Sequence, residues 1–175
     1  MRFLKDSLFY ASSLKDGRIS VGGVSEVQDV IQSESPDLNK FPTQEDWYSY
    51  MYMSAMAVRP DGRYLAAASS LGGILEIFDL NKKKGHVIRP LPETIGGFMC
   101  LAATDKYLYA TLHGKANPTS MPMAICKFDW KGNPIDRFDC GKYPIYSFTV
   151  TEDDRTAYAL AVDDEGEHIL LKIEL

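Results

Sequence analysis

Short apolar runs separated by turn residues form the dominant pattern of this chain. The runs are four to eight residues long, rich in β-branched and aromatic residues, and bounded by Gly, Pro, Asp and Asn. Apolar positions at helical spacing are almost absent. Because this pattern is typical of β-strands joined by hairpins, the sequence predicts an all-β fold.

The clearest group of strands begins at Tyr52. Strands are predicted, in order, at YMSAMAV, RYLAAASS, GILEIFDL and HVIRPL. The first two are joined by Pro60-Asp61-Gly62, where proline presets the turn dihedral and glycine can take a positive φ. This order predicts a four-stranded antiparallel meander.

The same pattern then restarts twice, at GFMCLAA and at IYSFTVT. The turn aspartates Asp61, Asp105 and Asp153 are 44 and 48 positions apart. A period in the forties with four strands per unit predicts the blades of a β-propeller. We expect one domain over 1–175, with blades or blade remnants at about 3–40, 51–91, 97–139 and 145–175.

The first and last units are both expected to be incomplete. The first unit is predicted to contain the second, third and fourth strands of a blade, at DSLFYASSL, RISVGGV and DVIQSE, and to lack the innermost strand. The last unit has three strands and no fourth. The sequence therefore predicts a partial ring of about three to four blades. Such a chain is a fragment, half of a pair that completes a ring, or a closed four-bladed ring; we favour pairing with another copy or a missing half.

Charge and hydropathy exclude two classes of partner. The 175 residues carry a net charge of −5, with a pI of about 5.2, so nucleic acid is not an expected partner. The basic run NKKKGH is interpreted as a solvated hairpin loop. The chain contains no run of 18 apolar residues, so no membrane span is predicted. The N-terminus has no signal-peptide core, so we expect the cytoplasm, or the periplasm or cell envelope if a longer precursor exists.

The residues that usually carry chemistry form no recognisable site. The cysteines Cys100, Cys126 and Cys140 show no CxxC spacing, so neither a disulfide framework nor a zinc site is predicted. Motifs for nucleophilic, metal-dependent or phosphate chemistry are missing. The acidic run DDEGE lacks the spacing of a calcium loop and is interpreted as a solvated hairpin. We expect no catalytic residue, metal or cofactor in this chain.

Aromatic residues gather in the connections expected at one face of the ring. Such rings provide contact area and a polar group for binding. The long loop HGKANPTSMP adds a further candidate, because long loops on rigid scaffolds tend to carry function. The predicted ligand-binding residues are Trp47, Tyr48, Tyr50, Tyr52, His113, Asn117, Tyr143 and Tyr146. The alternative is that half of these rings plug the channel or pack between blades.

Two segments resemble a known family. These segments are MAVRPDGRYLAAASSLGGILEIFDL and FTVTEDDRTAYALAVDDEGEHILLKIEL. Their strand-turn-strand order and their IFDL-like third strands are similar to those of blades of the bacterial TolB-like six-bladed propellers. WD40 blades share the size, but their Gly-His and Trp-Asp signatures are missing. The resemblance implies that this chain corresponds to the C-terminal half of a ring.

Two functions remain open at this point. The first is a non-enzymatic scaffold that binds a protein, a peptide or a glycan. The alternative is half of a propeller hydrolase or lyase whose catalytic residues lie in missing blades or in a second chain. The predicted inner strands carry no carboxylate, which favours the scaffold. The residues of these inner strands that are expected to line the channel are Ser54, Met56, Met99, Leu101, Ser147 and Thr149.

Overall fold

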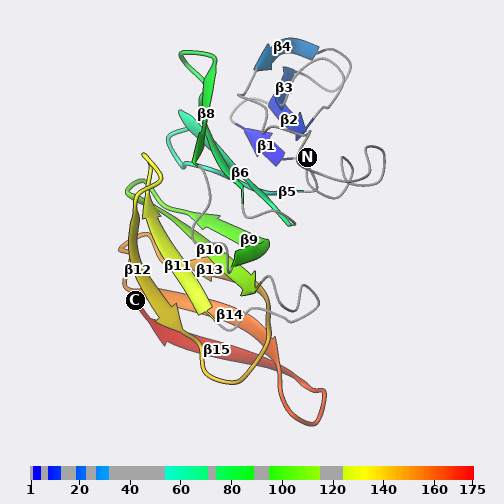
Figure 1. Ribbon diagram of the computed structural model, residues 1–175, viewed down its shortest axis with the longest axis vertical. Helices are drawn as coiled ribbons and strands as arrows, with labels where there is room; N and C mark the ends of the chain where they lie inside the picture. Colours follow the sequence, from blue (N-terminus) through cyan, green and yellow to red (C-terminus); the bar gives the residue numbers. More distant parts are fainter. Residues whose placement is uncertain are drawn as a thin grey trace.

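The structure is a computed structural model that describes part of the chain. The backbone is described for residues 2–4, 8–12, 19–22, 27–31, 54–70, 74–88, 95–114 and 124–175. Side chains are described for residues 54–70, 74–85, 97–112 and 124–175. The elements in these ranges are all β-strands (Figure 1), and none of the described residues forms a helix that could cross a membrane.

The described strands form four antiparallel sheets, each of which is a meander of consecutive strands. The first sheet contains β1 (Arg2–Leu4), β2 (Leu8–Ser12), β3 (Ile19–Gly22) and β4 (Val27–Ile31). The second contains β5 (Ser54–Val58), β6 (Tyr64–Ser69), β7 (Leu75–Asp79) and β8 (Lys84–Ile88). The third contains β9 (Ile95–Ala103), β10 (Tyr107–Gly114), β11 (Ala124–Asp129) and β12 (Pro134–Asp139). The last contains β13 (Ile145–Val150), β14 (Thr156–Val162) and β15 (His168–Glu174).

The first strands of successive sheets lie next to one another. β1 contacts β5, β5 contacts β9, and β9 contacts β13. Figure 1 shows the sheets following one another from the blue first sheet to the red last one. Meander sheets whose first strands gather along one line are the blades of a β-propeller. The predicted all-β fold of partial propeller blades is confirmed.

The prediction for the first unit is wrong, whereas that for the last unit is confirmed. Arg2–Leu4 pairs with β2 in the register Phe3 to Phe9, so the first sheet has the innermost strand that the sequence pattern seemed to lack. This strand has only three residues, too few to show an alternation of apolar and polar positions. The last sheet has three described strands, as expected.

The turn between β5 and β6 has the predicted geometry. Gly62 takes a φ of 75°, and its N–H donates to the carbonyl of Arg59 at 2.8 Å. The Asp61 carboxylate accepts the N–H of Arg63 at 2.9 Å. Because a positive φ is costly for most residues, glycine is the residue that closes this hairpin with least strain.

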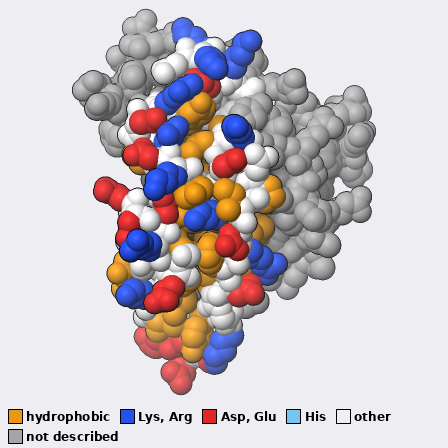
Figure 2. Space-filling view, turned by 90° about the vertical axis from the view of Figure 1, so that its left-hand side faces the viewer, with side chains coloured by type: hydrophobic (Ala, Val, Ile, Leu, Met, Phe, Trp, Pro, Cys, Tyr) orange, Lys and Arg blue, Asp and Glu red, His pale blue; other side chains and the backbone are white. Residues whose placement is uncertain are grey.

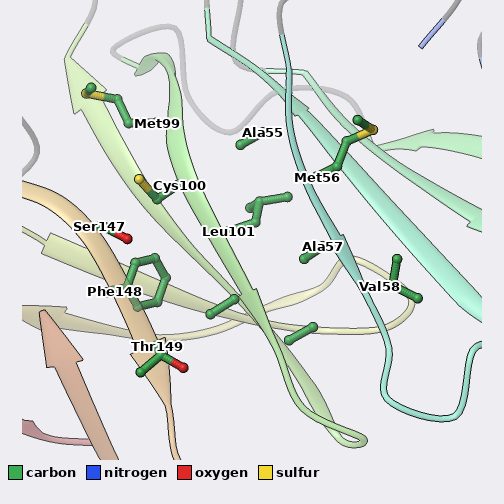
Figure 3. A pocket seen from close by; sticks show the side chains of 12 residues that line it. Ala55, Met56, Ala57, Val58, Met99, Cys100, Leu101, Ser147, Phe148 and Thr149 are labelled. Atoms are coloured by element: carbon green, nitrogen blue, oxygen red, sulfur yellow. The ribbon is translucent and has the colours of Figure 1, made fainter. Parts of the chain in front are cut away.

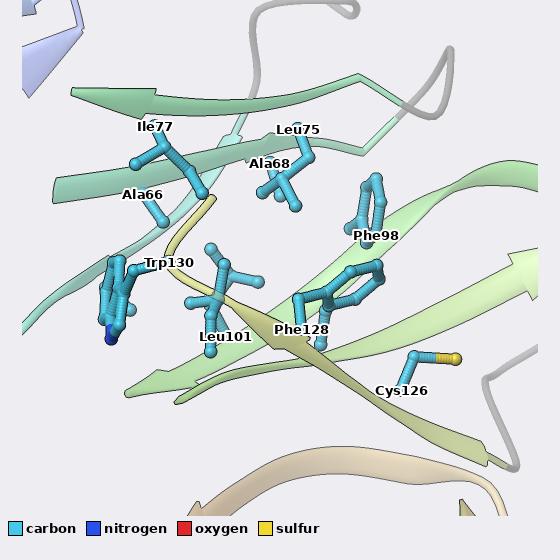
Figure 4. Close-up of a cluster of buried hydrophobic side chains, with 12 residues drawn as sticks. Ala66, Ala68, Leu75, Ile77, Phe98, Leu101, Cys126, Phe128 and Trp130 are labelled. Atoms are coloured by element: carbon cyan, nitrogen blue, oxygen red, sulfur yellow. The ribbon is translucent and has the colours of Figure 1, made fainter. Parts of the chain in front are cut away.

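Two of the described apolar cores join the second, third and last sheets in series. One lies between the second and third sheets and contains Ile77, Phe98, Leu101, Phe128 and Trp130 (Figure 4). The other lies between the third and last sheets and is built around Tyr109, Ile125, Ile145 and Phe148. The third sheet therefore contributes to both cores, one on each of its faces.

Candidate functional site

A groove runs along the first strands of the second, third and last sheets. Its volume is about 540 Å³. β5, β9 and β13 each contribute consecutive residues, because the open edges of these strands face the groove. The lining residues are Ala55, Met56, Ala57, Val58, Met99, Cys100, Leu101, Ala102, Ala103, Ser147, Phe148 and Thr149.

This groove is the channel expected from the sequence. Met56, Met99, Leu101, Ser147 and Thr149 line it as predicted, whereas Ser54 is not among the lining residues. In Figure 3, Leu101 lies near Ala55 and Ala57 of β5, and Ser147 and Phe148 of β13 lie on its other side. The alanines and Cys100 were not predicted, because alternation along a strand identifies the side chains of one face and not the residues at the strand edge.

The groove is lined by apolar and sulfur-containing side chains with two hydroxyls. Ser147 and Thr149 are exposed, and Met99 and Cys100 are half-buried. No carboxylate or imidazole is among the lining residues, and the described residues contain no group of three or more potential metal ligands. The open strand edges add backbone N–H and C=O groups to this lining, so the groove offers hydrogen-bonding groups beside the apolar side chains.

Cys100 is held in the groove by hydrogen bonds on both its backbone and its side chain. Its N–H donates to Thr111 Oγ1 at 3.0 Å, and its Sγ donates to the carbonyl of Tyr146 at 3.0 Å. Burial raises the pKa of the Cys100 thiol above its ordinary value. A raised pKa lowers the fraction of thiolate, which is the nucleophilic form of cysteine.

A buried polar cluster fixes the relative position of the third and last sheets beside the groove. Asp154 takes a φ of 61° in the turn between β13 and β14, and its side chain reaches the third sheet. Asp154 Oδ1 accepts the Thr104 hydroxyl at 2.6 Å and the Tyr109 hydroxyl at 3.0 Å. Trp130 Nε1 donates to the carbonyl of Thr104 at 3.1 Å. All four residues are buried, so the cluster is a structural clamp between blades.

Tyr143 and Tyr146 lie at the end of the last sheet where two connections meet. Lys142 in the β12–β13 connection forms an ion pair with Asp164 in the β14–β15 hairpin, so both connections lie on one side of the ring. The Lys142 ammonium lies 5.1 Å from the centre of the Tyr143 ring. The Tyr146 ring meets that of His168 edge-on at 6.3 Å and is 41% exposed. Neither tyrosine lines the groove.

The remaining predicted ligand-binding residues stay predictions. Trp47, Tyr48, Tyr50, Tyr52 and Asn117 lie outside the described residues. The backbone of His113 lies in β10, paired with Gly97 of β9, whereas the sequence analysis placed it in the following loop. Its side chain also lies outside the described residues.

The last sheet exposes a cluster of apolar side chains on one face, beside the exposed polar residues His168, Lys172 and Glu174 of β15. Along β14, Ala157, Ala159 and Ala161 are buried, whereas the alternate residues Tyr158 and Leu160 are 38% and 42% exposed. Leu170 of β15 lies directly opposite Leu160 and is 70% exposed. The corresponding strands of the second and third sheets are buried on both faces along most of their length. We refer to Tyr158, Leu160 and Leu170 as the terminal patch.

On the side of the molecule shown in Figure 2, the described charged residues do not form a large field of one sign. Figure 2 shows basic and acidic side chains mixed with hydrophobic ones over the described part of one side of the molecule. Acidic side chains gather at its lowest tip, the height at which Figure 1 places the β14–β15 hairpin. That hairpin contains Asp163, Asp164, Glu165 and Glu167, and the Asp163 carboxylate accepts the N–H groups of Glu165 and Glu167. The hairpin is thus closed by its own backbone, as the solvated-loop interpretation requires.

Comparisons with known proteins find similarity at the level of structure. No protein-family model matches the sequence, and no curated protein matches it. The match to hydrazine synthase of Kuenenia stuttgartiensis covers 96% of this chain and 43% of the hydrazine synthase chain, with a TM-score of 0.64 and 14% identity. A chain of the mitotic checkpoint complex overlaps with 68% of this chain and 32% of its own, with a TM-score of 0.51 and 12% identity. The β-propeller domain of Cps50 (Swd1) from Myceliophteria thermophila overlaps with 68% of this chain and 38% of its own, with a TM-score of 0.45 and 16% identity.

These similarities concern the fold alone, because all three identities are very low. The chain spans less than half the length of each of these three proteins. The meander sheets and the line of first strands show that this chain has the fold of a partial β-propeller, and the similarity to the chains with TM-scores of 0.64 and 0.51 agrees with this fold.

Proposed function

We propose that this chain is a non-enzymatic propeller scaffold that binds a protein or peptide partner. The observation that carries the proposal is the terminal patch. A monomeric surface has no need to keep Leu160 and Leu170 side by side in water, and clustered exposed apolar residues mark interaction sites.

Tyr143 and Tyr146 support a second contact region. Tyr146 and His168 belong to the last sheet, the sheet that carries the terminal patch, so a partner seated there could also reach Tyr143 at the adjacent connection. A glycan is the alternative ligand for the aromatic residues, including Trp47, because sugars stack on exposed rings. We assign the protein partner first, since the patch is aliphatic as well as aromatic.

We also propose the finer placement within propellers. The chain is a single partial domain over 1–175 of the TolB-like, six-bladed, bacterial kind, and it works with another copy or with further blades. The support is the repeated end of the third strand, Phe78-Asp79-Leu80 in the second sheet and Phe128-Asp129-Trp130 in the third.

The hydrolase or lyase alternative gains no support from the described groove. Its lining offers the Ser147 and Thr149 hydroxyls without a carboxylate or imidazole among the lining residues to activate them. The thiol of Cys100 has a raised pKa. On this alternative, an acid or base would come from a second chain or from further blades.

The test is site-specific photocrosslinking in the cells that make the protein. A photoreactive amino acid is introduced in place of Leu160, and in a matched chain in place of Ile135, which is 50% exposed on β12 of the third sheet. We expect an adduct with another protein from position 160 and none from position 135. Equal labelling from both positions, or labelling from neither, would contradict the proposal.

Binding of the captured protein, once purified, is then measured by calorimetry. Leu160→Lys should weaken the affinity at least about tenfold, because it buries a charge in an apolar contact. Ile135→Lys should leave the affinity unchanged. An oligosaccharide array probed with the wild-type chain tests the glycan alternative separately.

A further inference from the structure

The outermost described strand of the last sheet differs from that of the third sheet. β12 begins with Pro134 and carries Asp136, Arg137 and Asp139, all of which are exposed. Proline and charge on an edge strand prevent it from pairing with another chain. β15 has the sequence HILLKIE, has no proline, carries its charged residues Lys172 and Glu174 near one end, and exposes Leu170 next to its centre. Among the described strands it pairs with β14 alone (Figure 1).

The hydrogen bonds of the β14–β15 hairpin reveal which backbone groups of β15 point outward. Leu175 N–H donates to the Arg155 carbonyl at 2.9 Å, and Asp163 N–H donates to the Glu167 carbonyl at 3.0 Å. In an antiparallel ladder, alternate residues bond to the same neighbour. The odd-numbered residues of β15 therefore bond to β14, and the even-numbered ones direct their N–H and C=O groups away from it.

The sequence of β15 is complementary to itself when a second copy lies antiparallel to it. If Leu171 lies on the two-fold axis, Ile169 faces Ile173 of the other copy on the half-buried side. On the exposed side, His168 faces Glu174 and Leu170 faces Lys172. On the half-buried side apolar side chains thus meet apolar ones, and on the exposed side the one acidic residue meets a histidine rather than a second carboxylate.

This register also places the backbone groups correctly. The four residues that direct N–H and C=O groups outward are His168, Leu170, Lys172 and Glu174. In the self-paired arrangement they face one another in pairs, 168 with 174 and 170 with 172. A shift by one residue would set outward groups opposite inward ones and exchange the two faces of the strand.

We propose that two copies of this chain associate through β15, antiparallel and centred on Leu171, to form one continuous sheet. The interface is isologous, because the same strand is used on both sides of the two-fold axis. It uses the strand edge, whereas the proposed partner site uses the sheet face, so the two proposals fail independently.

The register is tested by disulfide cross-linking of the full chain under mild oxidation. Leu171→Cys should form a dimer, because residues opposite each other at a non-hydrogen-bonded position lie about 4.5 Å apart at Cα, within reach of a disulfide. Ile169→Cys and Ile173→Cys, from the same face of the same strand, are the matched controls. Each alone should remain monomeric on a denaturing gel, since its own copy lies about 14 Å away, whereas a mixture of the two should cross-link.

The association itself is tested by sedimentation over a range of concentrations. Wild-type chain should show a concentration-dependent dimer. Leu170→Pro removes an outward N–H without touching the bonds to β14, and should raise the dissociation constant roughly 30-fold, because the dimer loses the bond twice. Leu160→Lys, on the sheet face, should leave the dimer intact.

The outcomes distinguish the two proposals. A monomer at all concentrations together with no Leu171→Cys dimer would overturn the self-pairing. A cross-link from Ile169→Cys alone that exceeds that of Leu171→Cys would overturn its register. Loss of the dimer in Leu160→Lys would overturn the assignment of the contact to the strand edge. If Leu170→Pro does not fold, the cross-linking set still decides, since its variants keep a side chain of moderate size on every position.

Discussion

Tyr109 is fully buried, and its hydroxyl joins the third sheet to the turn of the last one. Burial raises the pKa of Tyr109, and the hydrogen bond to Asp154 and the negative charge there raise it further. The hydroxyl therefore keeps its proton and donates at any physiological pH. Since Thr104 donates to the same carboxylate oxygen, one acceptor in the last sheet binds two donors of the third sheet.

We expect Tyr109→Phe to lower the free energy of unfolding by about 1.5 kcal/mol, because it removes a buried hydrogen bond to a carboxylate and little volume. The measurement is chemical denaturation followed by circular dichroism. Tyr158→Phe is the control, since Tyr158 lies on the exposed face of β14 and should change stability by less than about 0.5 kcal/mol. Equal effects of the two variants would show that the Tyr109–Asp154 bond contributes little.

At the scale of the element, an aspartate carboxylate that accepts backbone N–H groups closes the hairpin between the third and fourth strands of the second sheet and of the third sheet. Asp79, at the end of β7, accepts the N–H groups of Asn81 and Lys82 at 3.2 and 3.1 Å. Asp129, at the end of β11, accepts those of Lys131 and Asn133 at 2.8 and 2.9 Å. Each carboxylate thus replaces the bonds that the strand ladder no longer provides in the turn.

The Asp79 turn is expected to weaken in acid. Burial alone would raise the pKa of Asp79, but the Lys82 N–H and the Arg63 guanidinium outweigh it and hold the pKa below its ordinary value. A carboxyl with a lowered pKa contributes stability that is fully present above the unfolded value of about 3.9 and is lost as the pH falls through the folded value. Asp79→Asn should therefore cost about 1 kcal/mol near pH 6 and less near pH 3.

Urea denaturation at the two pH values measures this difference. Asp136→Asn, on the exposed strand β12, is the matched control and should give nearly the same small effect at both. A loss for Asp79→Asn that is as large in acid as at neutral pH would contradict the assigned role of the carboxylate.

The repeated strands and turns could be predicted because each obeys a local rule. The Pro60-Asp61-Gly62 hairpin and the three-stranded last sheet follow from turn residues and alternating apolar positions. The strand Arg2–Leu4 could not be found in this way, because three residues show no period. The patch on the last sheet was also hidden, since TAYALAV of β14 is as apolar as the buried YLAAAS of β6. Exposure depends on what covers a strand, which local sequence does not encode.

The candidate site was predictable only in part for a related reason. Alternation along the first strands identified Met56, Met99 and Thr149 as groove residues. Asp154 was not anticipated as a clamp, because its partners Thr104 and Tyr109 are distant in sequence and belong to another blade. A side chain that acts across blades leaves no periodic signal in its own segment.

At the scale of the whole molecule, the described sheets are linked as a series. Tyr64 of the second sheet stacks on Trp130 of the third at 5.9 Å, within the core that also contains Phe128. Phe148 belongs to the other core, between the third and last sheets. In such an arrangement each blade is stabilised by its neighbours. A loss of packing in one core should therefore destabilise the two blades that share this core more than the others.

Hydrogen exchange of two matched variants tests this linkage. Phe128→Ala and Phe148→Ala each remove a buried ring, at a cost of about 3 to 5 kcal/mol. Phe128→Ala should accelerate amide exchange in β6 and β7 of the second sheet more than in β14. Phe148→Ala should accelerate amide exchange in β14 more than in β6 and β7, because its cavity lies in the core that holds β14 against the third sheet. Equal acceleration of β6, β7 and β14 in both variants would instead show that the blades unfold as one cooperative unit, in which case the terminal sheet is as firmly held as the interior ones despite its uncovered face.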